Sequence, residues 1–81
     1  MSKNLIRKNI NLSLEFDRYV VSNPSVLKSV PSGAHIILTS RTDKKLSDAN
    51  LNAVRGSRAG RFVEAHKSGA KWAIRKVSAS R

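Results

Sequence analysis

The chain has 81 residues, of which 16 are Lys or Arg and 5 are Asp or Glu, so its formal net charge is +11. This length fits one small domain, and the lack of cysteine excludes disulfides, thiolate metal sites and thiol nucleophiles. Hydrophobic residues make up 40 % of the chain, which is enough for a modest core. No apolar run approaches the ~18 residues of a transmembrane helix. We therefore expect a cytoplasmic protein without a signal peptide or membrane association.

The first half of the chain predicts two helices. Between Asn11 and Ser22, apolar residues at helical spacing form one face. Asn23 and Pro24 end this helix and start a second, short one, because proline is tolerated at the first helical position. A turn at Pro31-Ser32-Gly33 follows. The apolar face of the first helix consists of Leu12, Phe16, Tyr19 and Val20.

A strand and a third helix are predicted next. The segment from Ala34 to Ser40 has three consecutive apolar residues, which predicts a strand that is buried on both faces and central in its sheet. Ser47 is the expected cap of the third helix. The glycines Gly56 and Gly60 are unfavourable inside a helix, so we expect this helix to end between residues 55 and 60.

The last part of the chain favours a hairpin of residues 61–66 and 71–77, closed by a four-residue loop. This pairing places His66 opposite Lys71 and sorts apolar from polar side chains. The alternative is a third helix that continues through His66, followed by one strand. In the hairpin, the apolar face carries Val63, Ala65, Trp72 and Ile74. The polar face carries Glu64, His66, Lys71 and Arg75, together with Ala73.

These elements predict an α+β fold in the order helix-helix-strand-helix-strand-strand. The sheet is expected to be three-stranded and mixed, with the helices on one face. We expect residues 1–9 to form a flexible basic arm, residues 10–78 a single domain and residues 79–81 a tail. The expected core consists of Phe16, Tyr19, Ile36, Leu38, Val63, Trp72 and Ile74.

Two neighbouring segments resemble a known family. The first is Asn23-Pro24-Ser25-Val26-Leu27, and the second runs from Val30 through the Pro31-Ser32-Gly33-Ala34 turn to Ile37. This pattern resembles a family of small bacterial proteins of unknown function, from which the basic C-terminal hairpin departs. The resemblance implies a small α+β fold in a bacterial setting and supplies no functional residues.

The basic residues favour nucleic-acid binding, DNA or RNA, through phosphates and with low sequence specificity. Base stacking is disfavoured because Phe62 is the only aromatic residue expected outside the core. His35 and His66 lack a second ligand at helical spacing, so we expect no metal site. We also expect no cofactor and no enzyme activity. The candidate phosphate-binding residues are Arg41, Lys44, Lys45, Arg55, Arg58, Arg61, Lys67, Lys71, Arg75 and Lys76.

Two other functions remain open. A protein-interaction module, such as a toxin–antitoxin-type subunit or a homodimer, would use an open sheet edge or bind an acidic partner. A small basic ribonuclease would use Glu64 and His66 for proton transfer, with Lys71 and Arg75 stabilising the phosphorane charge. Cross-strand charge pairing explains the same four residues without catalysis, and we favour that interpretation.

Overall fold

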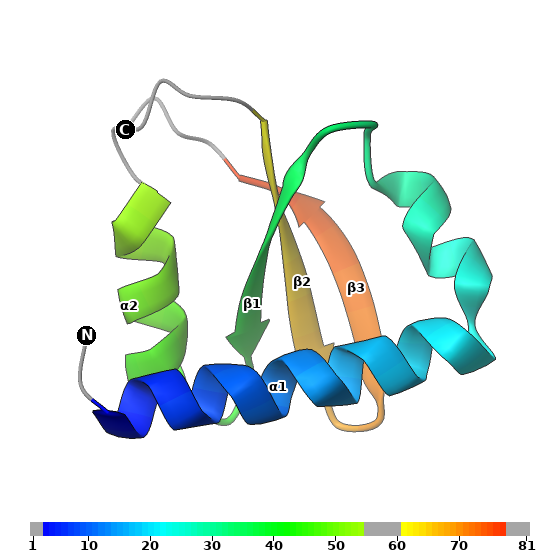
Figure 1. Cartoon of the computed structure of the whole chain (residues 1–81). Coiled ribbons are helices and arrows are strands. Elements are labelled where there is room, and N and C mark those ends of the chain that lie inside the picture. Colours follow the sequence, from blue (N-terminus) through cyan, green and yellow to red (C-terminus); the bar gives the residue numbers. More distant parts are fainter. Residues whose placement is uncertain (1–2, 55–60, 78–81) are drawn as a thin grey trace.

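Six elements build the fold, which is described here from a computed structural model covering residues 3–54 and 61–77. Figure 1 shows their arrangement. In chain order they are α1 (Lys3–Ser22), the 3-10 helix η1 (Pro24–Ser29), β1 (His35–Ser40), α2 (Lys44–Val54), β2 (Phe62–Ser68) and β3 (Lys71–Lys76). The predicted α+β class and the predicted order of elements are confirmed.

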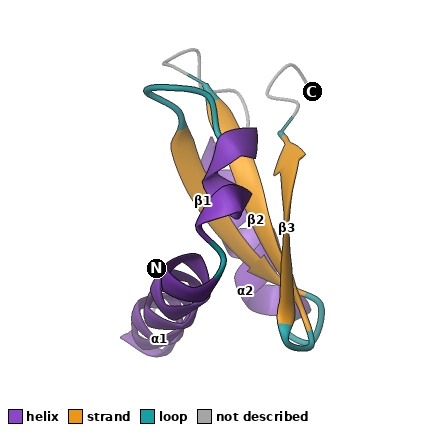
Figure 2. Cartoon of the chain, turned by 90° about the vertical axis from the view of Figure 1, so that its right-hand side faces the viewer, coloured by secondary structure: helices purple, strands orange, loops and turns teal. Residues whose placement is uncertain are grey.

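The three strands form one mixed sheet in the order β1-β2-β3. β1 and β2 are parallel, and β2 and β3 are antiparallel. Helix α1 and η1 lie on one face of this sheet (Figure 2), while α2 connects the two parallel strands. The mixed three-stranded sheet is therefore as the sequence predicts.

Helix α1 begins at Lys3, eight residues before the predicted start. Residues 3–9, expected in a flexible arm, are therefore helical. Tertiary contacts explain the difference: Leu5 packs against the core, and Asn9 exchanges two side-chain hydrogen bonds with Asn50 of α2, at 3.1 and 2.7 Å. Such long-range contacts stabilise helical turns whose own sequence gives a weak signal.

Strand β1 lies at an edge of the sheet, not at its centre as predicted. Helix α2 lies along the outer edge of β1, and its side chains hydrogen-bond to backbone groups of Leu38 and Ser40. The Ser40 N–H donates to Ser47 Oγ at 2.8 Å, and Ser47 Oγ donates to the Ser40 carbonyl at 3.0 Å. Asn50 Nδ2 donates to the Leu38 carbonyl at 2.8 Å. A covered edge explains why an edge strand can be so apolar.

The start of α2 also differs from the prediction. The helix begins at Lys44, and its cap is Asp43 instead of Ser47. The Leu46 N–H donates to Asp43 Oδ1 at 3.1 Å, which is the usual contact between a cap side chain and the third helical residue. Ser47 lies inside the helix, and its hydroxyl hydrogen-bonds to the Ser40 backbone at the edge of β1 instead.

The hairpin of β2 and β3 is present, so the alternative with a continuous helix is wrong. Its loop has two residues, Gly69 and Ala70, and not four. Gly69 has φ +64°, a conformation that a two-residue hairpin loop requires and that glycine adopts without strain. The pairing is shifted by two residues from the prediction, so Glu64 faces Arg75 and His66 faces Ala73. Because side chains alternate with a period of two, every residue keeps its predicted face.

The core lies between α1, the N-terminal end of α2 and the sheet. The rings of Phe16 and Trp72 pack with their centroids 5.0 Å apart, at an interplanar angle of 56°. Ile36, which was expected in the core, is 37 % exposed at the end of β1 that neither α1 nor Asn50 covers. The buried core cluster consists of Leu12, Phe16, Leu46, Ala65 and Trp72, with Tyr19, Val20, Leu38 and Ile74 packed around it.

Candidate nucleic-acid interface

Among residues 3–54 and 61–77, four Lys or Arg side chains form ion pairs with carboxylates. Two of these pairs involve helix α2 or its cap: Lys8 Nζ lies 3.2 Å from Asp43 Oδ2, and Lys44 Nζ lies 2.6 Å from Asp48 Oδ2. The other two join the hairpin to its surroundings. They are the pair of Lys67 with Glu15 and the pair of Arg75 with Glu64. Three of the predicted phosphate-binding residues, Lys44, Lys67 and Arg75, are thus partly neutralised within the molecule.

The predicted phosphate-binding residues do not all converge. Arg55 and Arg58 lie outside the described residues. One group lies where β1 and β2 end and the hairpin turns, and the Arg41 N–H donates to the Lys67 carbonyl there at 2.9 Å. That group consists of Arg41, Lys44, Lys45, Lys67 and Lys71. Arg61 directly precedes β2 and Lys76 pairs with Val63, so both lie at the opposite end of the sheet. Arg75 is one residue from that end.

We call the sheet face opposite α1 the back face. By the strand registers it carries His35, Ile37 and Thr39 from β1, Phe62, Glu64, His66 and Ser68 from β2, and Lys71, Ala73 and Arg75 from β3. The rings of His35 and Phe62 lie side by side there, with centroids 5.4 Å apart and an interplanar angle of 32°. His35 is exposed and Phe62 is half-buried. From the sequence, Phe62 was expected outside the core, but no partner for its ring was predicted.

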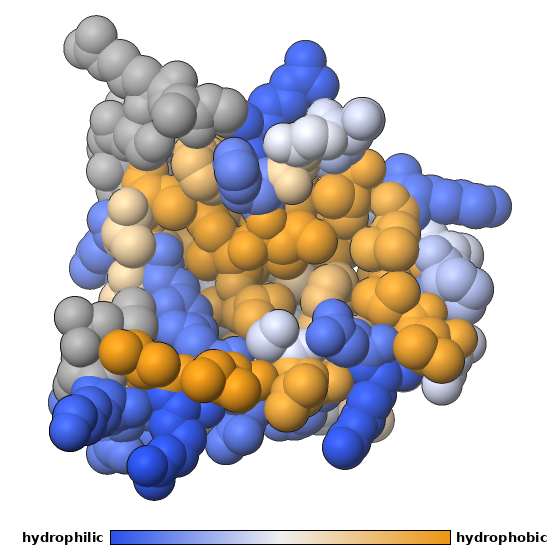
Figure 3. All heavy atoms as spheres, viewed as in Figure 1, coloured by the Kyte–Doolittle hydropathy of each residue, from blue (hydrophilic) through white to orange (hydrophobic). Residues whose placement is uncertain are grey.

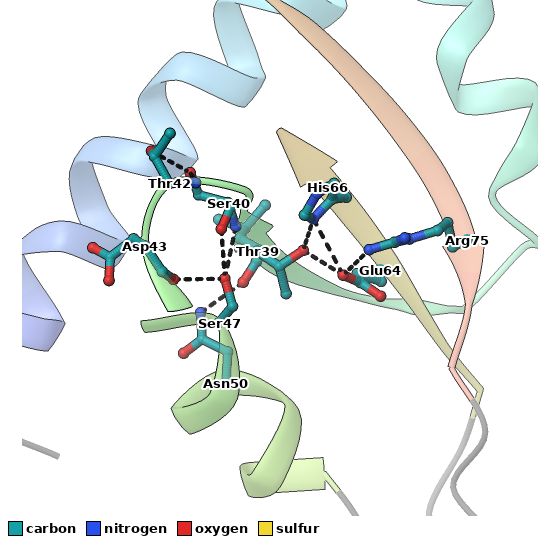
Figure 4. A network of polar contacts seen from close by, with 10 residues as sticks. Thr39, Ser40, Thr42, Asp43, Ser47, Asn50, Glu64, His66 and Arg75 are labelled. Carbon is teal, nitrogen blue, oxygen red and sulfur yellow. Dashed lines mark hydrogen bonds and ion pairs between the residues drawn. The ribbon is translucent and has the colours of Figure 1, made fainter. Parts of the chain in front are cut away.

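A polar cluster joins the three strands on the back face (Figure 4). Thr39 Oγ1 donates to Glu64 Oε2 in a short hydrogen bond, and an Arg75 guanidinium nitrogen donates to the same oxygen at 2.7 Å. His66 Nδ1 lies 2.8 Å from Thr39 Oγ1 and 3.5 Å from Glu64 Oε2. The single hydroxyl proton of Thr39 is used by Glu64, so Nδ1 of His66 must be the donor in its bond to Thr39.

The Glu64 carboxylate is buried yet ionised. Burial alone would raise its pKa, but hydrogen bonds from Thr39 and Arg75 and the nearby positive charges outweigh this effect and lower the pKa below its usual value of 4.5. A carboxylate held ionised by donated bonds is a poor proton donor at neutral pH. The cluster therefore cross-links the strands and neutralises an internal charge.

Only part of this cluster was predicted from the sequence. Glu64, His66 and Arg75 are brought together as expected, whereas Lys71 is opposite Ser68 at the hairpin end. Thr39 was missed although it is the buried bridge between Glu64 and His66. The available signal was its position two residues after Ile37 on the same face of β1, but recognising it required the parallel register of β1 and β2.

Neither a metal site nor a membrane-spanning helix is present among residues 3–54 and 61–77. No group of three His, Cys, Asp or Glu side chains there is placed to hold a metal ion. Over the same residues, no helix combines the length and the apolar character needed to span a bilayer.

Comparison with known protein families gives a match over most of the chain. The model of a family of unknown function, DUF5647, matches residues 4–63. The chain belongs to this family. The segments around Asn23-Pro24 and Pro31-Ser32-Gly33, on which the sequence resemblance rests, lie within the matched region. The DUF5647 match extends from α1 to the start of β2, so Glu64, His66 and Arg75 lie beyond it. Searches of curated proteins and of solved structures found no match.

Proposed function

We propose that this DUF5647 chain is a cytoplasmic, non-catalytic module that binds DNA or RNA mainly through phosphates, with low sequence specificity. The supporting observation is the surplus of cations after the internal ion pairs are formed. Within the described part of the chain, most basic side chains have no carboxylate partner. They are Lys3, Arg7, Arg18, Lys28, Arg41, Lys45, Arg61, Lys71 and Lys76. Such unpaired cations attract polyanions and release their counterions on binding.

Of these unpaired cations, the strand registers place Lys71 on the back face, which supports this function in other ways as well. Among the described strand residues on this face, the only carboxylate is that of Glu64, which is 8 % exposed and already paired with Arg75, so a phosphate meets no unpaired carboxylate among them. Lys71 and Arg75 are exposed on the same face. The neighbouring rings of His35 and Phe62 add a small surface on which an unpaired base can stack. These features favour a single-stranded ligand.

A salt series tests the proposal. Fluorescence anisotropy of a labelled single-stranded oligonucleotide should report an affinity that falls steeply between about 50 and 200 mM salt, because binding releases counterions. A scrambled oligonucleotide of the same composition should bind with similar affinity. Failure to bind at the lowest salt, or an affinity that is independent of salt, would contradict phosphate recognition.

Matched charge reversals locate the interface. Lys71→Glu, on the back face, should weaken binding and reduce the magnitude of the log–log salt slope by about one phosphate contact. Lys28→Glu, an equal charge change on η1 at the opposite face, should lower affinity much less. Equal losses for both variants would show that the overall charge attracts nucleic acid without a defined interface on the back face.

The ribonuclease alternative is tested with the same reagents. Labelled RNA incubated with the wild-type protein should remain intact, because the Glu64 carboxylate is tied to Thr39 and Arg75. RNA cleavage by the wild type that disappears in His66→Ala would replace the binding proposal with a catalytic one. Cleavage that persists in His66→Ala would point to a contaminating nuclease.

A further inference from the structure

Helix α1 has a second apolar face that the fold does not bury. Ile6, Ile10 and Leu14 recur every four residues and are 48 %, 56 % and 52 % exposed. Figure 3 shows hydrophobic side chains along the front of this helix, continuous with an apolar area of the sheet above it. Contiguous exposed apolar surface on a small protein usually marks an interaction site. Only the buried face of this helix was predicted from the sequence.

The apolar stripe of Ile6, Ile10 and Leu14 borders a groove between α1, β1 and α2. Ile10 and Leu14 of α1 form one wall of this groove, Ile36 of β1 lies within it, and Ala53 of α2 lies on the far side. The groove has a volume of about 460 Å³ and is mainly apolar. It explains why Ile36 remains exposed at the end of β1.

The two ends of the stripe carry opposite charges. Lys3 and Asp17 each lie seven residues from Ile10, which is two helical turns, so all three lie on the same side of α1. Both charged side chains are exposed. Among the described residues, Asp17 is the only carboxylate without an ion pair within the chain. Its carboxylate is therefore free to pair with a cation of another molecule.

We propose that two copies of this chain associate through α1 in an antiparallel, two-fold arrangement centred on Ile10. In this arrangement Ile6 packs against Leu14 of the second copy, and Lys3 faces Asp17 of the second copy. Both contacts occur twice because the interface is isologous. A parallel arrangement would instead oppose Lys3 with Lys3 and Asp17 with Asp17.

The charge pattern favours a second copy over other occupants. An acidic protein or an anionic lipid surface would suit the overall charge of +11, but it would place Asp17 against like charges. A second copy instead supplies a cation for Asp17 and an anion for Lys3, while its leucine and isoleucine side chains cover the apolar stripe. Self-association therefore satisfies both features of the surface.

The net charge predicts how salt changes the affinity of the two copies for one another. Two copies that each carry +11 repel one another at low ionic strength, so added salt should strengthen the dimer by screening. Screening also weakens the Lys3–Asp17 pairs, but these are few compared with the general repulsion. Nucleic-acid binding has the opposite salt dependence, so the two processes can be separated.

Sedimentation velocity of the full chain, free of nucleic acid, tests the interface over a range of protein concentrations at low and high salt. The wild type should form a concentration-dependent dimer that is favoured at high salt. Ile10→Glu should sediment as a monomer and should remain folded by circular dichroism. Leu27→Glu is the matched control, because Leu27 is 42 % exposed on η1 and lies outside the stripe. A monomeric wild type, or an Ile10→Glu dimer of unchanged affinity, would overturn the proposal.

A charge exchange tests the antiparallel register. Asp17→Lys and Lys3→Glu, each alone, should weaken self-association at least about fivefold, because each replaces two attractive contacts with repulsive ones. Mixing the two variants restores an oppositely charged pair at both ends, so the mixture should form a heterodimer of near wild-type affinity. Without this recovery, Lys3 and Asp17 do not face one another and the register is wrong.

Discussion

Glu64 and Arg75 face each other directly across β2 and β3, and the guanidinium donates to the carboxylate at 2.7 Å. Thr39 of β1 donates to the same carboxylate oxygen, so one buried charge connects all three strands. No buried side-chain nitrogen or oxygen in the described part of the chain lacks a hydrogen-bond partner. The cluster thereby meets the main condition for keeping a charge inside a small protein.

Acidification should weaken the fold through this carboxylate. The pKa of Glu64 is below its ordinary value of 4.5 in the folded protein, because the donated bonds outweigh the effect of burial. A lowered folded pKa contributes stability that is complete above 4.5 and is lost as the pH falls through the folded value. Thermal unfolding between pH 7 and 3 should therefore show a falling melting temperature.

The variant Glu64→Gln isolates this contribution. Its melting temperature should depend less on pH below 4.5 than that of the wild type, since one of the groups responsible is gone. Asp43 supplies a second contribution, because hydrogen bonding from the Leu46 N–H lowers its pKa as well. Parallel pH profiles for Glu64→Gln and the wild type would mean that the carboxylate has similar surroundings in the folded and unfolded chains.

Removing the guanidinium should cost more than removing a neighbouring surface cation. Arg75→Ala leaves a buried carboxylate with one strong donor fewer, and we expect a loss of about 1–3 kcal/mol in the free energy of unfolding. Lys71→Ala, on the same strand and face but without an ion pair, should change it by less than about 0.5 kcal/mol. Urea denaturation measures both.

A double variant separates the pair from the packing of its side chains. Arg75→Ala combined with Glu64→Gln should be less destabilised than the sum of the two single changes, because no buried charge is left unpaired. Strict additivity would show that the two residues do not interact energetically, despite their short contact.

Side-chain periodicity predicted the parts of the fold that depend on alternation or helical spacing. Leu12 and Phe16 are buried as their spacing requires, and Val63, Ala65 and Trp72 lie on the predicted face of the hairpin. Even the error of two residues in the hairpin register preserved the faces. The polar grouping of Glu64, His66 and Arg75 followed from the same alternation.

Features set by tertiary contacts could not be predicted in this way. The apolar run at Ile36, Ile37 and Leu38 indicates burial, but it does not distinguish a central strand from an edge strand covered by a helix. The start of α1 depends on the pairing of Asn9 with Asn50, which are 41 residues apart. The role of Thr39 depends on the register between parallel strands joined by α2.

The cap of α2 offers a local test of the structure. Asp43→Ala removes the acceptor for the Leu46 N–H and the partner of Lys8, and it should lower the free energy of unfolding by about 0.5–2 kcal/mol. Asp48→Ala removes only an exposed pair with Lys44 one helical turn away, worth about 0.3–0.5 kcal/mol. Comparable effects of the two changes would argue against Asp43 as the cap.

Outside the Glu64 cluster, the hydrogen bonds of Asn50 at the edge of β1 should be the polar contacts whose removal lowers the stability of the fold most. Asn50→Ala removes the donor to the Leu38 carbonyl and both bonds to Asn9, and it should destabilise the fold by about 1–3 kcal/mol. An exposed asparagine on α1, Asn11, provides the control, and Asn11→Ala should be near neutral. Chemical denaturation of the two variants measures the difference.

Loss of Asn50 should also promote association through the sheet, because an uncovered strand edge pairs readily with other chains. This effect is best measured by light scattering in the Ile10→Glu background, where the proposed α1 interface is already disrupted. Scattering that rises with time for the Asn50→Ala double variant, but not for the Asn11→Ala one, would assign the new association to the edge of β1. Equal scattering would mean that the remaining contacts of Ser47 with Ser40 are enough to protect that edge.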